Sequence, residues 1–101
     1  MYILKSIEPS KLLTKKYTAN FFDPKTLKSK KVQFGAKGYR DFTTISDSAE
    51  AKKARDAYRS RHKKDKLSDP YSPGALSWYI LWGNHTNITD NISDYKKHFG
   101  V

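Results

Sequence analysis

The chain has 101 residues and carries 20 lysines and arginines against 10 aspartates and glutamates, a formal net charge of +10 at pH 7. A chain of this length buries one core, so we expect a single domain over residues 1–101, and the absence of cysteine excludes disulfides and thiolate metal sites. The apolar N-terminal stretch is interrupted at Lys5 and is too short for a signal peptide or a membrane span. We therefore expect a protein that is not secreted and has no membrane partner.

Residues 16–22 alternate between polar and apolar types, which predicts a half-buried strand whose inward side chains are Tyr17, Ala19 and Phe21. Asp23 and Pro24 then supply turn chemistry, since proline presets the first central dihedral of a type I turn and aspartate accepts from the amides ahead of it. A second alternation starts at Lys30, with Val32 and Phe34 inward. The pattern predicts a β-hairpin over residues 16–34.

A helix is predicted from Asp47 to near His62. Asp47 and Glu50 have the spacing of a capping box, in which each side chain accepts from an amide at the helix start. Alanines and Tyr58 form a narrow apolar stripe, while the exposed side is expected to carry Lys52, Lys53, Arg55, Arg59 and Lys63. Lys52, Arg55, Arg59 and Lys63 follow one another at three- and four-residue steps as one cationic ridge, which is either a solvated helix face or a surface for a polyanion.

A second, short helix is predicted after Ser72, which can cap it, with Pro73 at the first helical position, where the missing amide costs nothing. This helix is apolar nearly all round up to Trp82, so we expect it to be the buried element, and Gly83 and Asn84 to end it.

A third helix is predicted from the helical spacing of Ile88, Ile92, Tyr95 and Phe99, with Gly100 beyond its end. Basic residues in its last turn would complement the helix dipole. Three asparagines near this helix, Asn84, Asn87 and Asn91, fit the glycosylation acceptor pattern. We expect them to be capping and turn residues instead.

Two further β-compatible runs, residues 2–7 and 41–45, could add edge strands to the hairpin and give a three- or four-stranded antiparallel sheet. Taken with the three helices, the sequence predicts an α+β fold: a small antiparallel β-sheet built on a hairpin and packed by two or three helices.

The loop after the hairpin contains Gly35, Lys37 and Gly38. Glycines with a lysine can hold phosphate through backbone amides, but the Walker spacing is absent, and the similar clamp of KH modules joins two helices rather than following a strand. The loop is therefore either a turn built on positive-φ glycines or a contact for phosphate.

No pattern in the sequence predicts catalysis, a metal site, a cofactor or a small-molecule substrate. The three histidines, His62, His85 and His98, lie in different predicted elements, and zinc needs three or four converging ligands. A nuclease-like activity would have to use Asp41 or Asp47 with a divalent ion, yet each has a cap or turn role in the predicted structure.

Three blocks in a fixed order give the chain a family resemblance: Phe34-Gly35-Ala36-Lys37-Gly38-Tyr39-Arg40-Asp41-Phe42-Thr43, then Tyr58-Arg59-Ser60-Arg61-His62, then Pro73-Gly74-Ala75-Leu76-Ser77-Trp78-Tyr79-Ile80-Leu81-Trp82-Gly83. The chain resembles the small basic proteins of uncharacterised function encoded by large nucleocytoplasmic DNA viruses, of the chlorella-virus, mimivirus and iridovirus kind, over about residues 15–100. The resemblance brings no catalytic residues. It implies a viral protein of the virion or of the infected host cell, in the cytoplasm or the nucleus.

Eight lysines and arginines fall among the fifteen residues from Lys52 to Lys66, and this surplus indicates a polyanionic partner. The principal hypothesis is a non-enzymatic structural protein that binds nucleic-acid phosphates without sequence preference, to neutralise or package a genome. The residues expected to make these contacts are Lys37, Tyr39, Arg40, Lys52, Arg55, Arg59, Arg61, Lys63 and Lys64.

The alternative hypothesis is a minor capsid protein that cements or scaffolds a viral shell. Under it, the partners are capsid proteins whose acidic patches meet the same cations. Exposed aromatic side chains, Tyr2, Tyr71 and Trp82, would then fix the protein to its neighbours.

Overall fold

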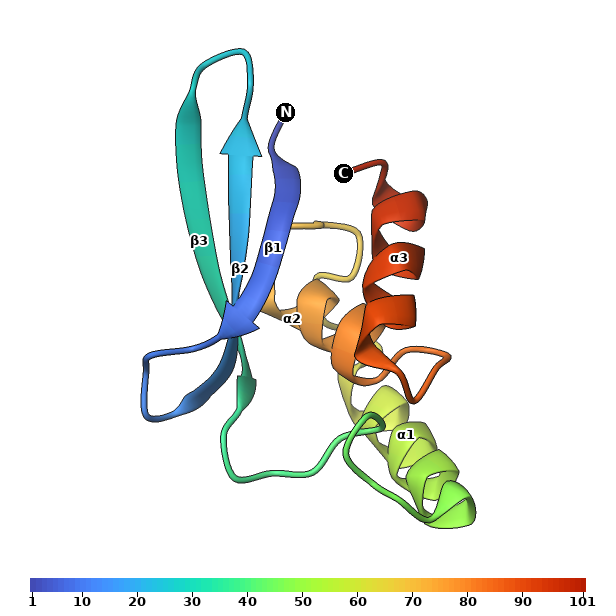
Figure 1. The fold of residues 1–101 in the computed structure, drawn as a ribbon. Helices are drawn as coiled ribbons and strands as arrows, with labels where there is room; N and C mark the ends of the chain where they lie inside the picture. The colour runs from blue at the N-terminus through green and yellow to red at the C-terminus, as the bar shows by residue number, and fades with distance from the viewer.

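The computed structural model describes all of residues 1–101 as a three-stranded antiparallel sheet with helices packed against one of its faces (Figure 1). The strands are β1 (Ile3–Pro9), β2 (Lys15–Asp23) and β3 (Lys28–Ala36), in the spatial order β1-β2-β3. The helices are α1 (Ser48–His62), α2 (Pro73–Leu76), the π-helix η1 (Ser77–Leu81) and α3 (Ile88–Phe99). The predicted α+β class and hairpin-based sheet are confirmed.

The turn between β2 and β3 forms where Asp23 and Pro24 predict it, but its closing backbone bond reaches one residue further than in the expected type I turn. The carbonyl of Asp23 accepts from the amide of Leu27 at 2.8 Å, and its side chain accepts from the amide of Lys25 at 2.9 Å. The bond from Lys25 and the nearby N-terminal ammonium of Met1 favour the carboxylate form, so the pKa of Asp23 lies below its ordinary value. Local chemistry therefore determines how the hairpin closes.

One of the two expected edge strands is confirmed and the other is wrong. Residues 3–9 form β1, which pairs with β2 through an irregularity between Leu4 and Ser6. Residues 41–45 form a turn instead of a strand. The reason is that Asp41 accepts from the amide of Thr43 at 2.8 Å while its own amide donates to the hydroxyl of Thr44 at 2.9 Å, and such side-chain bonds compete with strand pairing.

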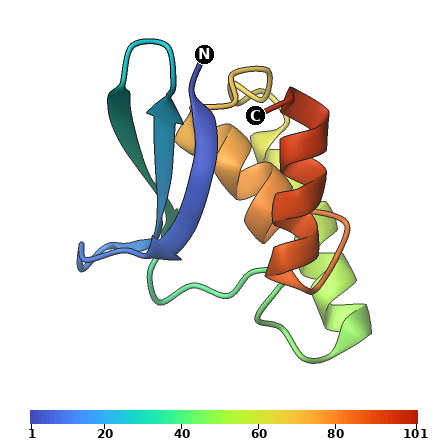
Figure 2. The same ribbon diagram turned by 45° about the horizontal axis from the view of Figure 1, so that its top comes forward.

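The core lies between the sheet and the α2–η1 segment, with α3 packed on η1 (Figure 2). Its members come from the inward sides of the strands, from α2, η1 and α3, and from the C-terminus: Leu4, Ala19, Phe21, Val32, Phe34, Leu76, Ile80, Leu81, Tyr95 and Val101. Gly35 has a φ of 79°, and a Cβ there would lie 2.8 Å from Leu81 Cδ1. Glycine is therefore needed at this position both for its backbone angle and for the close approach of β3 to η1.

The helices begin and end at the residues that the sequence indicated. Asp47 caps α1 by accepting from the amide of Glu50 at 2.8 Å, Ser72 caps α2 ahead of Pro73, and Gly100 ends α3 in the left-handed region. The Glu50 side chain does not accept from the amide of Asp47, as a capping box requires, but pairs with Arg40. None of the helices has the length and apolar character required to span a membrane.

A fully buried asparagine joins α3 to the end of η1. The Nδ2 of Asn91 donates to the carbonyl of Ile80 at 2.9 Å and to the carbonyl of His85 at 2.7 Å, while its Oδ1 accepts from the amide of His85 at 2.9 Å. The expectation that Asn91 is a capping or turn residue is wrong, because the position faces the core. Asn87 does cap α3, as expected, by accepting from the amide of Thr89.

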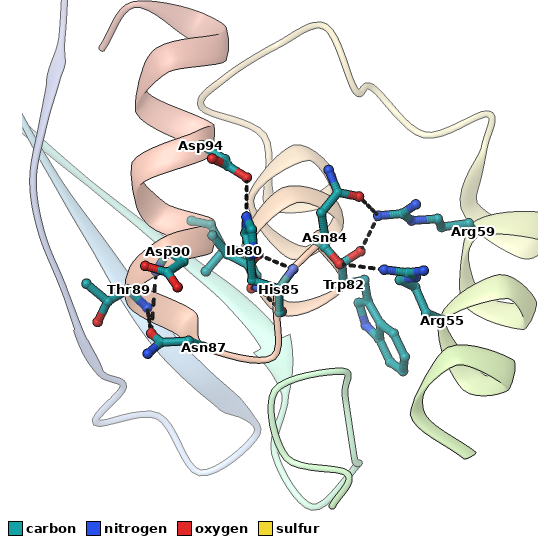
Figure 3. Close-up of polar contacts among 12 residues, drawn as sticks. Arg55, Arg59, Ile80, Trp82, Asn84, His85, Asn87, Thr89, Asp90 and Asp94 are labelled. Carbon is teal, nitrogen blue, oxygen red and sulfur yellow. Dashed lines mark hydrogen bonds and ion pairs between the residues drawn. The ribbon is translucent and has the colours of Figure 1, made fainter. Parts of the chain in front are cut away.

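Helix α1 lies apart from the sheet and is held to the rest of the protein by two arginines (Figures 1 and 3). Arg59 Nη2 donates to the carbonyl of Trp82 at 2.9 Å, and Arg55 Nη1 donates to the carbonyl of Gly83 at 3.4 Å. These carbonyls follow the last turn of η1, where the helix dipole favours a cation. A small apolar cluster, formed by Phe42, Ile45 and Ala51, completes the attachment.

Replacing Asn91 by leucine should destabilise the protein by about 3 kcal/mol, because the carbonyl of Ile80 and the amide and carbonyl of His85 would lose their partner. Urea unfolding followed by circular dichroism measures this. The matched control is Ser93→Ala on the exposed side of the same helix, which should change stability by less than about 0.5 kcal/mol. Equal stability of N91L and the native protein would contradict the role assigned to Asn91.

Replacing Arg59 by alanine should loosen α1, with a cost of about 2 kcal/mol for the lost bonds from its charged group. Amide hydrogen exchange should then quicken throughout α1 and stay unchanged in β2 and β3. Arg59→Lys should not restore protection, since an ammonium lacks the planar fork of a guanidinium. The control is Lys53→Ala, an exposed residue of the same helix, which should leave exchange in α1 as it is.

Candidate nucleic-acid interface

A cleft of about 550 Å³ lies between the sheet, the loop that follows β3, α1, and the α2–η1 segment. Cationic side chains reach it from three places in the sequence: Lys15 and Lys16 at the start of β2, Arg40 after the glycine loop, and Arg61 near the end of α1. Two carboxylates, Asp41 and Asp65, also line it. The lining therefore carries a net charge of +2.

A buried ion pair links β2 to the segment that precedes α1. Lys16 Nζ lies 2.5 Å from Asp41 Oδ2, and the two side chains are 14% and 2% exposed. The other carboxylate oxygen of Asp41 accepts from the amide and the hydroxyl of Thr43. Because each charge of the pair is neutralised by the other, Lys16 and Asp41 fix the shape of the cleft without leaving charge available for a ligand.

Three stacked rings form the α1 side of the cleft. The ring of Tyr58 lies 4.6 Å from the ring of Trp82 at an interplanar angle of 9°, and 4.3 Å from the ring of His62 at 22°. His62 Nδ1 lies 2.9 Å from Asp65 Oδ2. The stack brings three aromatic rings to the cleft beside the cations, although the Tyr58 ring that both neighbours stack on is only 8% exposed.

Three of the nine predicted contact residues come together at the cleft, namely Tyr39, Arg40 and Arg61. The Tyr39 side chain is 75% exposed, and Arg40 pairs with Glu50 at 2.5 Å. Four others are exposed but do not line the cleft: Lys37 in the glycine loop, Lys52 on α1, and Lys63 and Lys64 just beyond α1.

The predicted cationic ridge on α1 is wrong for two of its four members. Arg55 and Arg59 point into the molecule, where their guanidinium groups lie over the rings of Phe42, at 4.4 Å, and Trp78, at 5.7 Å. The Nε of each is buried without a partner, and burial, with the charge of Arg55 added, lowers the pKa of Arg59. Both arginines hold α1 in place, so neither is available to a phosphate.

The glycine loop is a turn, with φ of 79° at Gly35 and 90° at Gly38. Two of its amides are already engaged, since Lys37 donates to the carbonyl of Thr14 at 3.1 Å and Tyr39 donates to the carbonyl of Ala36 at 3.3 Å. This loop therefore offers a ligand the side chains of Lys37 and Tyr39, and those two amides are not free to cradle a phosphate.

Most of the positive charge has no acidic partner. Among the 20 lysines and arginines, only Lys16 and Arg40 lie within ion-pair distance of a carboxylate. The unpaired cations are not confined to one ridge, because lysines also lie along β3 and at the end of α3. The region around the cleft is where they occur together with exposed aromatic surface.

Two further expectations concern the acidic and aromatic residues. Asp41 is engaged with Lys16 and Asp47 with the start of α1, and no group of three histidines or carboxylates comes together.

The aromatics expected as exposed contacts for capsid proteins are packed instead: Tyr71 lies edge-on to Phe21 at 5.1 Å and to Tyr2 at 5.7 Å, and Trp82 stacks on Tyr58. That expectation of exposure is wrong.

Several residues of the cleft did not emerge from the sequence. Lys15 and Lys16 reach it because the hairpin register sets Lys15 opposite Ala36, next to the glycine loop. Tyr58 lines it where its ring stacks on Trp82, and His62 lines it where its ring stacks on Tyr58. The position of the two lysines could have been predicted, since the predicted hairpin puts the start of β2 beside the end of β3. The four-residue spacing of Tyr58 and His62 on one helix predicts that these two rings meet, but no local signal indicated their contact with Trp82.

The stability of the protein should fall between about pH 10 and pH 12. Burial, with the charge of Asp65 added, raises the pKa of Tyr58 from 10.0 to about 12. As the pH rises, the Tyr58 hydroxyl therefore loses its proton in the unfolded chain before it does so in the folded protein. The contribution of this hydroxyl to the free energy of unfolding is complete below pH 10 and is lost as the pH approaches 12, at about 1.4 kcal/mol per pH unit. Burial raises the pKa of Tyr95 as well.

Urea unfolding across this pH range tests the assignment. Tyr58→Phe should flatten the fall, whereas Tyr39→Phe, which changes an exposed ring, should leave it unchanged. An equally steep fall of the free energy of unfolding in Y58F and in the native protein would contradict the assignment of this pH dependence to Tyr58.

Searches of curated proteins and of solved structures found no match to this chain. A comparison with protein-family models did find one, over residues 5–62, which spans β1 to the end of α1 and is more than half of the chain. The protein therefore belongs to this family, which is described as a family of unknown function (DUF5754).

Proposed function

We propose that this protein binds nucleic acid without sequence preference and holds phosphates with the cations that line and flank the cleft. One observation carries the proposal: cations from three distant segments, Lys15, Arg40 and Arg61, line one cleft beside the exposed ring of Tyr39, and Lys15 and Arg61 have no acidic partner. Cations that track a backbone, together with aromatic rings on which bases stack, are the usual components of such surfaces.

Further cations extend this surface beyond the cleft. Lys37 lies on the glycine loop, and Lys63 and Lys64 follow directly on α1, all exposed and without an acidic partner. A nucleic-acid strand that crosses the cleft would find positive charge on both sides of it. The long-range attraction between such a surface and a polyanion also speeds their encounter.

The types of cation favour contact without sequence readout. The chain has sixteen lysines and four arginines, and Arg55 and Arg59 are occupied in holding α1. Few guanidinium groups remain for the bidentate recognition of guanine, while a lysine ammonium is a point charge suited to phosphate. The binding we propose is therefore without sequence readout, and the role we propose for the protein is non-enzymatic.

The resemblance to small basic proteins of large DNA viruses supplies a context for this binding. In the virion or the infected cell, a protein of this kind would neutralise part of the genome charge during packaging. No observation favours the alternative of a minor capsid protein, since its three expected aromatic contacts are half-buried and packed against other rings of the same chain.

Affinity for nucleic acid should fall steeply with salt. If about five phosphates are neutralised on duplex DNA, the logarithm of the association constant should fall with the logarithm of salt with a slope of about −4.5. Fluorescence anisotropy of a labelled oligonucleotide, titrated at several salt concentrations, measures this slope. A slope near zero, or no binding at low salt, would refute the proposal.

A matched pair of double variants locates the surface. Arg61→Gln with Lys64→Gln should reduce the magnitude of the slope by about 2, because two phosphate contacts are lost. The control, Lys28→Gln with Lys31→Gln, removes the same charge from exposed positions near the opposite end of β3. The control should keep most of the slope, and equal losses in both would show that only net charge matters.

A further inference from the structure

We infer that the cleft accepts one unpaired nucleotide, base and phosphate together, so that the preferred partner is single-stranded nucleic acid. This inference rests on the proposed function and goes beyond it. Binding by surface charge alone needs no cavity and would favour a duplex, whose charge density is higher than that of a single strand. The observations that distinguish them are the size, the walls and the charge of the cleft.

The size of the cleft suits a nucleotide. Its volume of about 550 Å³ lies within the roughly 300–1,000 Å³ that is typical of sites for small organic ligands. A duplex keeps its bases paired and stacked, and taking one out costs a few kcal/mol. A single strand can present a base to the cleft without that cost, which favours it as the partner.

The walls of the cleft offer ring surface for a base. The stack of Trp82, Tyr58 and His62 lines one side, and Tyr39 stands exposed on the loop after β3. Bases stack on aromatic side chains whatever their identity, because every base has a π-face. Such walls therefore explain how a cleft could take a nucleotide while the protein stays indifferent to sequence.

The charges of the cleft suit a phosphate group attached to that base. Lys16 is neutralised by Asp41, and Arg40 is paired with Glu50. Lys15 and Arg61 make no ion pair and are the cations left for the phosphate. A nucleoside monophosphate unit combines the ring and the anion that these walls and cations would recognise, either as a free molecule or as part of a strand.

The test uses tryptophan fluorescence, since the chain has two tryptophans and only Trp82 lines the cleft. Titration with a single-stranded oligothymidylate should quench the fluorescence, and Trp82→Phe should abolish that quenching. Adenosine monophosphate at millimolar concentration should compete with the labelled strand. Adenosine alone and inorganic phosphate should not compete at the same concentration. Competition by inorganic phosphate as strong as that by adenosine monophosphate would overturn the base-binding part of the inference.

The strand preference is tested by comparing the single strand with a duplex of equal length. The single strand should bind roughly tenfold more tightly, which corresponds to one stacked base. Tyr39→Ala should weaken binding of the single strand more than binding of the duplex and so remove most of this difference, and Tyr39→Phe should restore it. The control is Lys53→Gln, which removes a charge outside the cleft and should change both affinities alike.

The outcomes separate the two proposals. Equal affinity for single and double strands, with a steep salt slope and no quenching of Trp82, would overturn the nucleotide site and leave the proposed function standing. Absence of binding to either nucleic acid at low salt would overturn both. Because Tyr39 is 75% exposed, its variants should fold as the native protein does, and circular dichroism checks this.

Discussion

The position of α1 depends on two guanidinium groups that meet the carbonyl end of η1. Arg59 and Arg55 donate to the carbonyls of Trp82 and Gly83, which no further helical turn satisfies. The apolar contacts of α1 are few, consisting mainly of small alanines and the ring of Tyr58. Without the two arginines, the helix that provides one wall of the cleft would lack most of its polar attachment. The cleft is thus a product of this contact between two segments far apart in the sequence.

Two kinds of positive charge therefore have different tasks in this small protein. One kind is internal: Arg55 and Arg59 join elements, and Lys16 is matched by the buried Asp41. The other kind is external and has no acidic partner, as at Arg61 and Lys64. The net charge alone does not distinguish them, since each residue adds the same unit. Only the second kind supports the proposed contact with phosphates.

The sequence predicted those features whose causes lie within one helical turn or one hairpin. Asp47 and Ser72 act as caps, and the β2–β3 hairpin forms, because the residues that decide each of them are neighbours in the chain. The directions of Arg59 and Asn91 could not be predicted in this way, since their partners are carbonyls that any residue could supply. A spacing signal did exist for Asn91, which lies four residues before the buried Tyr95 and hence on the same side of α3. The cleft itself required the packing of all these elements.

The acceptors that hold Arg59 and Arg55 are neutral backbone carbonyls, in contrast to the carboxylate that Arg40 meets at the surface. The pair of Arg40 with Glu50 is exposed, whereas the bonds from Arg59 and Arg55 to these carbonyls are partly buried. Dissolved ions weaken exposed charge pairs far more than partly buried hydrogen bonds. The wall formed by α1 should accordingly keep its place at salt concentrations that would release a strand from the proposed surface, so that such release would require no opening of the fold.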